Sequence, residues 1–172
     1  VSIYLDYAAT APMPEAIRAV YTKTLEVVGN PSSIHQSGQE ARALVEDSRA
    51  TLGGILGVDP MEVVFTSGGT EATNTWIKGR TFAMRAAGVE LPVWILTKAE
   101  HHATLDAVEW LERQGLARIR WVGVDGDAVI NLDDLESALG EFSAKEIAGV
   151  TTLVANNEVG SIQPVAEIAE IA

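Results

Sequence analysis

Cysteine is absent from the 172 residues, and basic side chains are scarce. Without cysteine there is no disulfide framework, no thiolate metal site and no cysteine nucleophile within these residues. Twelve Lys and Arg against 24 Asp and Glu give a formal net charge of −12. That charge has the wrong sign for a surface that neutralises nucleic-acid phosphates, so we expect no nucleic-acid partner.

Long hydrophobic runs and a signal peptide are also missing. No apolar run approaches the roughly 20 residues that a membrane span needs, and the start VSIYLDYAAT lacks the basic and apolar regions of a leader. We therefore expect a cytoplasmic protein with no membrane partner. The length suits one domain with a sizeable core and is short for two.

What the sequence does contain is an alternation of short apolar runs with longer amphipathic segments. This pattern is typical of an α/β domain with a mostly parallel sheet. Strands are predicted at residues 62–66, 93–97, 117–122 and 147–155. Helical periodicity predicts a helix over residues 36–57, and Pro12 and Pro14 can open an earlier helix that ends near Gly29. Asn131 is the predicted N-cap of a later helix, with Gly140 just past its end.

The end of the sequence also carries a prediction. Pro164 can begin a helix in which Val165, Ile168 and Ile171 recur at helical spacing, and the chain then stops without a cap or a following strand. A doubly wound sheet that stops in mid-helix leaves one flank uncovered. We therefore expect the sequence to be the N-terminal part of a longer protein.

The stretch FTSGGTEATN, residues 65–74, predicts a strand, a glycine turn and a helix that begins near Gly69. The unpaired N–H groups and the positive dipole end of that helix would face the turn. Glycines let a phosphate approach the backbone, and the hydroxyls of Ser67 and Thr70 can donate to its oxygens. The alternative is an ordinary turn capped by Ser or Thr. The stretch matches neither the phosphate loop nor the dinucleotide fingerprint.

Two further polar clusters follow predicted strands. Residues 99–102 read Ala-Glu-His-His, and residues 156–158 read Asn-Asn-Glu. Paired histidines can bind metal, stack on a ring or lie on a surface loop, but the remaining histidine, His35, is far away in sequence, so we expect no metal site. Two amides at a strand end are usually turn formers. Since carboxyl ends of parallel strands converge, the three clusters together predict one ligand crevice.

Five motifs, in order, resemble those of the cysteine desulfurases of the class V aminotransferase family. They are YLDYAATAP (4–12), GNPSSIHQSGQEAR (29–42), VVFTSGGTEATN (63–74), AEHHA (99–103) and NNEVGSIQP (156–164). The second motif is similar to the branch that supplies sulfur for iron–sulfur clusters and tRNA thiolation. The resemblance implies a three-layer α/β/α architecture, part of the large domain of a type I pyridoxal 5′-phosphate enzyme. Residues 1–14 would form an N-terminal arm, and residues 15–172 an incomplete large domain.

The resemblance also implies site residues. Gly69 and Thr70 would hold the cofactor phosphate, His101 would stack on the pyridine ring and help move protons, and Asn157 would hydrogen-bond the phenolic oxygen of the ring. His102 receives no role. Glu71 and Asn74 are expected to be structural, one capping its own helix and the other bracing the loop.

For activity, the resemblance implies conversion of L-cysteine to L-alanine, with sulfur passed to an enzyme persulfide and then to an acceptor or iron–sulfur scaffold protein. The family's Schiff-base lysine lies in a Ser-x-His-Lys motif that this chain lacks, and the catalytic cysteine is missing. Lys98, near the crevice, is not expected to replace that lysine. The chain alone is expected to be inactive, and the complete enzyme to be a homodimer.

Two alternatives stay open at this point. The chain could belong to another class V enzyme, such as a selenocysteine lyase or an aminotransferase. It could also be a non-catalytic scaffold that retains the fold.

Overall fold

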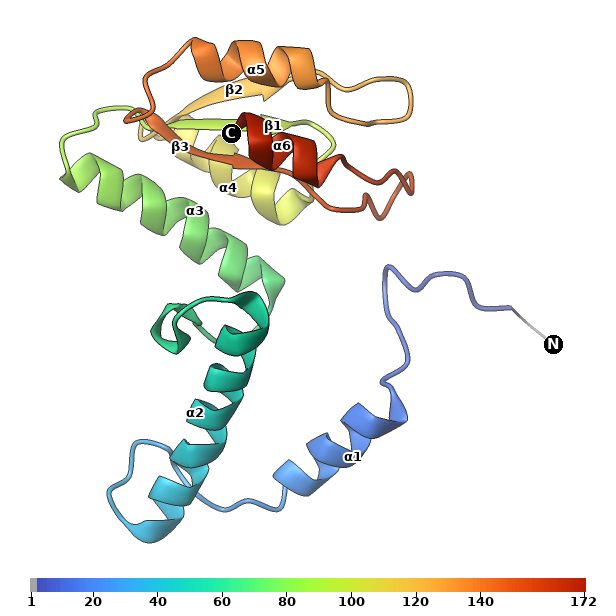
Figure 1. Ribbon diagram of the computed structural model, residues 1–172, viewed down its shortest axis with the longest axis vertical. Coiled ribbons are helices and arrows are strands. Elements are labelled where there is room, and N and C mark those ends of the chain that lie inside the picture. Colours follow the sequence, from blue (N-terminus) through green and yellow to red (C-terminus); the bar gives the residue numbers. More distant parts are fainter. Residues whose placement is uncertain (1–2) are drawn as a thin grey trace. The chain divides into compact units, whose positions relative to one another are not determined.

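The computed structural model describes residues 3–172 and divides into two compact units, one up to Phe65 and one from Thr66 to Ala172 (Figure 1). Residues 3–14 contain a turn but no helix or strand. The division of the chain into an arm of residues 1–14 and a domain of residues 15–172 stays a prediction.

The first unit contains two helices and a 3-10 turn. Helix α1 spans Glu15–Thr24 and begins directly after Pro14. It ends earlier than the predicted boundary near Gly29, because the N–H of Glu26 bonds to Lys23 O and leaves the helical pattern.

Helix α2 spans Gln36–Leu56, close to the predicted 36–57. His35 caps its start, accepting a hydrogen bond at Nδ1 from the N–H of Gly38. Gly57 ends it in the left-handed conformation with φ 70°, which glycine adopts without strain. Its apolar residues recur at helical spacing, but Ala41 is the one that is buried, while the others are half-buried or exposed: Leu44, Val45, Leu52, Ile55 and Leu56.

The strand predicted at residues 62–66 is wrong. Pro60–Glu62 form a 3-10 turn in which Asp59 and Glu62 cap each other's backbone. The carbonyl of Val63 is taken by a hydrogen bond from Arg49, and Phe65 is 47% exposed. Apolar β-formers alone do not make a strand, because a strand also requires a neighbouring backbone to pair with.

The second unit is built on a parallel sheet in the order β2-β1-β3. Strand β1 spans Val93–Thr97, as predicted, and all five residues are buried. Strand β2 spans Arg118–Val122, one residue later than the predicted start. Strand β3 spans Ile147–Thr151, so the predicted extension to residue 155 is wrong. Ala155 instead pairs antiparallel with Ile162 in a local hairpin.

Helices cover both faces of this sheet (Figure 1). Helices α3 (Gly69–Ala86) and α4 (His102–Arg113) pack on the face that presents Trp94 and Leu96. Helices α5 (Leu132–Gly140) and α6 (Val165–Ile171) pack on the face that presents Val93 and Ile95. Alternate residues of β1 therefore enter two separate cores, and the predicted three-layer α/β/α architecture is confirmed.

A buried polar pair lies in the first core. The indole N–H of Trp94 donates to the hydroxyl of Thr81 at 2.9 Å, and both side chains are fully buried. That hydroxyl donates to Ile77 O within α3. Gly149 of β3 lies beneath the indole, since a Cβ there would lie 2.9 Å from the Trp94 ring. The core therefore specifies one indole orientation by hydrogen bonding and close packing.

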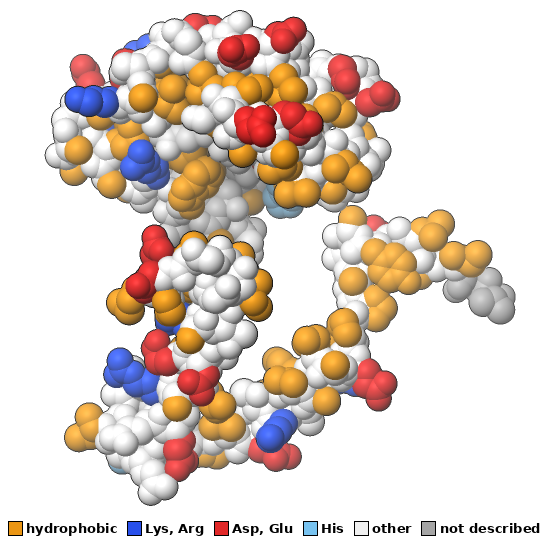
Figure 2. All heavy atoms as spheres, in the orientation of Figure 1, with side chains coloured by type: hydrophobic (Ala, Val, Ile, Leu, Met, Phe, Trp, Pro, Cys, Tyr) orange, Lys and Arg blue, Asp and Glu red, His pale blue; other side chains and the backbone are white. Residues whose placement is uncertain are grey.

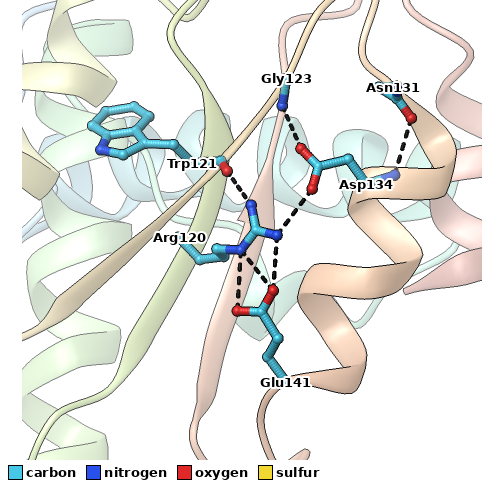
Figure 3. Close-up of polar contacts among 6 residues, drawn as sticks. All are labelled: Arg120, Trp121, Gly123, Asn131, Asp134 and Glu141. Carbon is cyan, nitrogen blue, oxygen red and sulfur yellow. Dashed lines mark hydrogen bonds and ion pairs between the residues drawn. The ribbon is translucent and has the colours of Figure 1, made fainter.

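Arg120 of β2 joins the sheet to α5 (Figure 3). Its guanidinium bonds to Asp134 at 2.9 Å and to Glu141 at 2.8 Å. The other oxygen of Asp134 accepts from the N–H of Gly123 at 2.7 Å, and Asn131 caps the helix as predicted. The N–H of Gly123 and then the guanidinium hold the pKa of Asp134 below its usual value.

Acidic side chains are spread over the visible face of the second unit (Figure 2), in line with the net charge of −12. Within residues 3–172, every helix is too short or too polar to cross a bilayer.

Candidate active site

The glycine turn leads directly into α3. Gly68 is the N-cap with an extended backbone, and Gly69 is the first helical residue, as predicted. The first hydrogen bond of the helical pattern runs from the N–H of Ala72 to Gly68 O at 3.0 Å. The N–H groups of Gly69 and Thr70 precede that bond and have no helical acceptor, so they can receive an anion.

Space lies in front of this turn. A Cβ built on Gly68 or Gly69 would meet no atom of the described chain within 4 Å. Neither position has the left-handed backbone conformation that would require glycine, because Gly68 has an extended φ of 165° and Gly69 is helical. The absence of side chains here therefore keeps the helix terminus open to a ligand.

Glu71 has the predicted structural role at the start of its own helix, whereas Asn74 bonds inside α3 and does not brace the loop as predicted. The Glu71 carboxylate accepts hydrogen bonds from the backbone N–H and the hydroxyl of Ser67, and these bonds lower its pKa. The Asn74 amide donates to Thr70 O at 3.0 Å. The Ser67 hydroxyl, expected to face a phosphate, is thus engaged by Glu71, and this leaves Thr70 as the hydroxyl for a ligand.

The loop after β1 and the hairpin after β3 line one cavity of about 190 Å³. It is formed by residues 98–102 and 156–158 together with Leu105. The structure thus brings together two of the three polar clusters at the carboxyl edge of the sheet. The glycine turn is outside the lining of this cavity.

His101 has a fixed orientation at the start of α4. Its Nδ1 accepts a hydrogen bond from the N–H of Ala103 at 3.0 Å, so the ring caps the helix. Because Nδ1 acts as an acceptor, Nε2 is the nitrogen left to exchange a proton with a ligand. The ring is exposed beside the cavity and can stack on a planar group.

The two neighbouring amides have different environments. Asn156 is used structurally: its Nδ2 donates to Ala99 O at 2.9 Å, and its Oδ1 accepts from the N–H groups of Glu158 and Val159. The Asn157 side chain is exposed, and no hydrogen bond to it is present within the described residues. Asn156 therefore behaves as the turn former, while Asn157 is available for a ligand.

Glu100 is a buried acid that sequence reasoning passed over. It is 9% exposed and lies against the cavity, next to His101. Burial raises the pKa of its carboxyl, while the N–H of Leu153 and the hydroxyl of Thr104 act in the opposite direction. Its position shortly after a buried strand was the available signal, but its hydrogen-bond partner Leu153 is distant in sequence.

Residues 3–172 match the sequence profile of the family described as aminotransferase class V. The chain belongs to the class V aminotransferase family. Its predicted membership is confirmed, and with it the fold class.

One relative of this class V aminotransferase chain is the "IscS-like cysteine desulfurase" of Mycobacterium tuberculosis, which is 41% identical over 170 residues. The match covers 98% of this chain and 42% of that protein. The solved structure of a "NIFS-LIKE PROTEIN" superposes with a TM-score of 0.85 at 31% identity, covering 99% of this chain and 45% of the other.

A second solved structure, "SspA in complex with cysteine", has a TM-score of 0.81 at 25% identity and covers 99% of this chain and 47% of the other. The class V aminotransferase chain thus spans less than half the length of these proteins.

Proposed function

We propose that this chain forms the phosphate-binding and ring-binding part of a pyridoxal 5′-phosphate-dependent cysteine desulfurase. The observation that carries the proposal is the open α3 terminus, where no hydrogen bond from the described residues 3–172 engages the N–H groups of Gly69 and Thr70, in the unit that also holds His101 and Asn157. The desulfurase name of the 41% identical relative supports the substrate class. A neighbour whose title names a complex with cysteine supports it further.

The residues fit the cofactor that the family implies. A helix terminus without Cβ atoms suits a phosphate dianion, which the dipole and N–H donors stabilise. The exposed imidazole of His101 offers a flat surface for an aromatic ring, and the amide of Asn157 can donate to a phenolic oxygen. Bound pyridoxal phosphate supplies the electron sink for a reaction in which an amino acid loses its α-proton.

His101 is the residue of this chain that we propose holds and moves a proton. Its Nε2 is the free ring nitrogen, since Nδ1 is occupied by the N–H of Ala103. Glu100, the buried acid next to it in sequence, lines the same cavity. The chain contains no cysteine, so a sulfur-accepting cysteine must be supplied by residues outside this sequence. A lysine that anchors the cofactor is proposed to come from outside it as well.

The partners we propose are L-cysteine, a sulfur acceptor or iron–sulfur scaffold protein, and a second copy of the protein. The test is to incubate L-cysteine, pyridoxal phosphate and a thiol reductant with the 172-residue chain and, separately, with the complete product of its gene. We expect equal amounts of alanine and sulfide from the complete product and neither from the chain alone. Alanine release by the chain alone would contradict the proposal that the anchoring lysine and the sulfur-accepting cysteine come from outside this sequence. In parallel incubations with L-selenocysteine, or with L-cysteine and a 2-oxo acid, selenide release or transamination in the absence of sulfide release from L-cysteine would favour the other class V activities.

A further inference from the structure

A tight hairpin carries Asn157. Ala155 pairs antiparallel with Ile162, and the N–H of Asn156 donates to Ser161 O at 2.8 Å. The N–H of Gly160 closes the turn on Asn156 O at 2.9 Å. The hairpin projects from the end of β3 at an edge of the sheet, where an isolated hairpin is only marginally stable without further contacts.

Gln163, the residue after this hairpin, reaches across to a different loop. Its side chain is 7% exposed, and both ends of its amide are used. The Oε1 accepts from the N–H of Ile130 at 2.9 Å, and the Nε2 donates to Ala128 O at 2.8 Å. These bonds join positions 33 and 35 residues apart in the sequence.

The loop that receives Gln163 is itself fixed. Oδ1 of Asp125 accepts from the N–H groups of Asp127 and Val129, and Ile130 is buried in the core beneath α5. Ala128 has a positive φ of 60°, a conformation that non-glycine residues adopt only when their surroundings hold it. The loop therefore offers Gln163 a rigid anchor.

The hairpin is tied to the crevice at its other end. The Asn156 amide donates to Ala99 O at 2.9 Å, in the loop that precedes His101. The two side-chain amides, of Gln163 and Asn156, thus hold the hairpin between two loops, at the edge of the sheet shown in Figure 1.

We propose that Gln163 is a positioning residue that fixes the hairpin of residues 155–162 against the loop of residues 125–130 and so holds Asn157 at the crevice. The part of this inference that concerns a ligand rests on the proposed function. The part that concerns the hairpin does not. Breaking the two bonds leaves a buried N–H and a partly buried carbonyl without partners, a cost that favours local opening of the hairpin.

The first experiment measures amide hydrogen exchange in the wild-type protein, in Gln163→Met and in a control, Gln114→Met. Methionine keeps the length of the side chain but cannot make the two hydrogen bonds. We expect the N–H groups of Ile130 and Gly160 to exchange about tenfold faster or more in Gln163→Met, with β1 unchanged. Gln114 is exposed on the same unit, so its variant should match the wild type. Unchanged exchange in the hairpin, or equal acceleration in β1, overturns the proposal.

If Gln163→Met does not fold, NMR of the wild-type protein still tests the proposed hydrogen bonds of Gln163. The side-chain amide protons of Gln163 must then exchange slowly and show nuclear Overhauser contacts to Ala128 and Ile130. Rapid exchange without such contacts overturns the proposal.

The second experiment compares two probes on the same proteins, pyridoxamine phosphate and inorganic phosphate. Gln163→Met should weaken pyridoxamine phosphate about tenfold, because Asn157 is no longer held. It should leave inorganic phosphate unaffected, because the glycine turn is separate from the hairpin. An equal loss for both probes, or no loss for either, overturns the positioning role. Failure of the wild-type protein to bind pyridoxamine phosphate overturns the proposed function instead. The hydrogen-exchange experiment then still tests whether Gln163 fixes the hairpin.

Discussion

Replacing Gly69 by alanine should separate ligand binding from stability. A Cβ at this position meets no atom of the described chain within 4 Å, so the free energy of unfolding should change by less than about 0.5 kcal/mol. The new methyl group occupies the space in front of the N–H donors of the α3 terminus. Loss of one charge-assisted hydrogen bond costs about 1.5–3 kcal/mol, so Kd for pyridoxamine phosphate should rise roughly 10- to 100-fold.

The matched control for this change is Gly79→Ala in the same helix. A Cβ at Gly79 also meets nothing within 4 Å, but this position lies in the interior of α3. Alanine there should stabilise the protein by about 0.5–1 kcal/mol and leave Kd unchanged. Calorimetric titration and urea unfolding of the three proteins provide both quantities. Wild-type affinity in Gly69→Ala, or an equal loss in Gly79→Ala, would refute the reasoning.

Three further outcomes are expected, each from urea unfolding. Thr81→Val leaves the buried indole N–H of Trp94 without an acceptor and should cost about 1–3 kcal/mol, whereas an unaltered midpoint would contradict that hydrogen bond. The raised pKa of Glu100 means that the unfolded state loses its proton first as pH rises. The free energy of unfolding should therefore decrease as pH rises from the ordinary glutamate pKa to the raised pKa. Glu100→Gln should remove that pH dependence. Arg120→Ala should destabilise the protein at low salt and less so at high salt, because it breaks the ion pair with Asp134; an effect independent of salt would argue against this.

The sequence predicts well those parts of the fold that are determined by residues close together in the sequence. Strand β1 is bounded by Pro92 and by the charged Lys98, and its five residues are all apolar or threonine. The start of α5 follows from the side chain of Asn131, which accepts from an N–H three residues later. Gly140 lies inside that helix rather than past its end, since boundaries depend on neighbours as well as on residue type.

The errors arise where pairing partners decide the structure. Residues 62–66 carry β-forming side chains, but their backbone is engaged by Arg49 and by the capping box of the 3-10 turn. Strand β3 ends at Thr151, before the predicted residue 155, and Ala155 pairs instead with Ile162. Neither interaction is visible in hydrophobic periodicity, which reports faces and not partners.

The candidate site divides in the same way. Its polar clusters are recognisable because His101 and Asn157 follow the predicted strands, and the glycine turn carries the signature of an open helix terminus. The supporting contacts are not recognisable, because Gln163 bonds to a loop more than 30 residues away and Glu100 accepts a hydrogen bond from the distant N–H of Leu153. Sequence patterns thus locate candidate site residues more readily than the residues that hold them in place.

The most direct test of the central claim is an amide proton–nitrogen NMR titration of the protein with pyridoxamine phosphate, which forms no imine with surface lysines. The account predicts saturable shifts at the N–H groups of Gly69 and Thr70 and at the loops that carry His101 and Asn157. Inorganic phosphate should shift only the first pair. Shifts confined to other surfaces, or no saturable shift at the α3 terminus, would contradict the account.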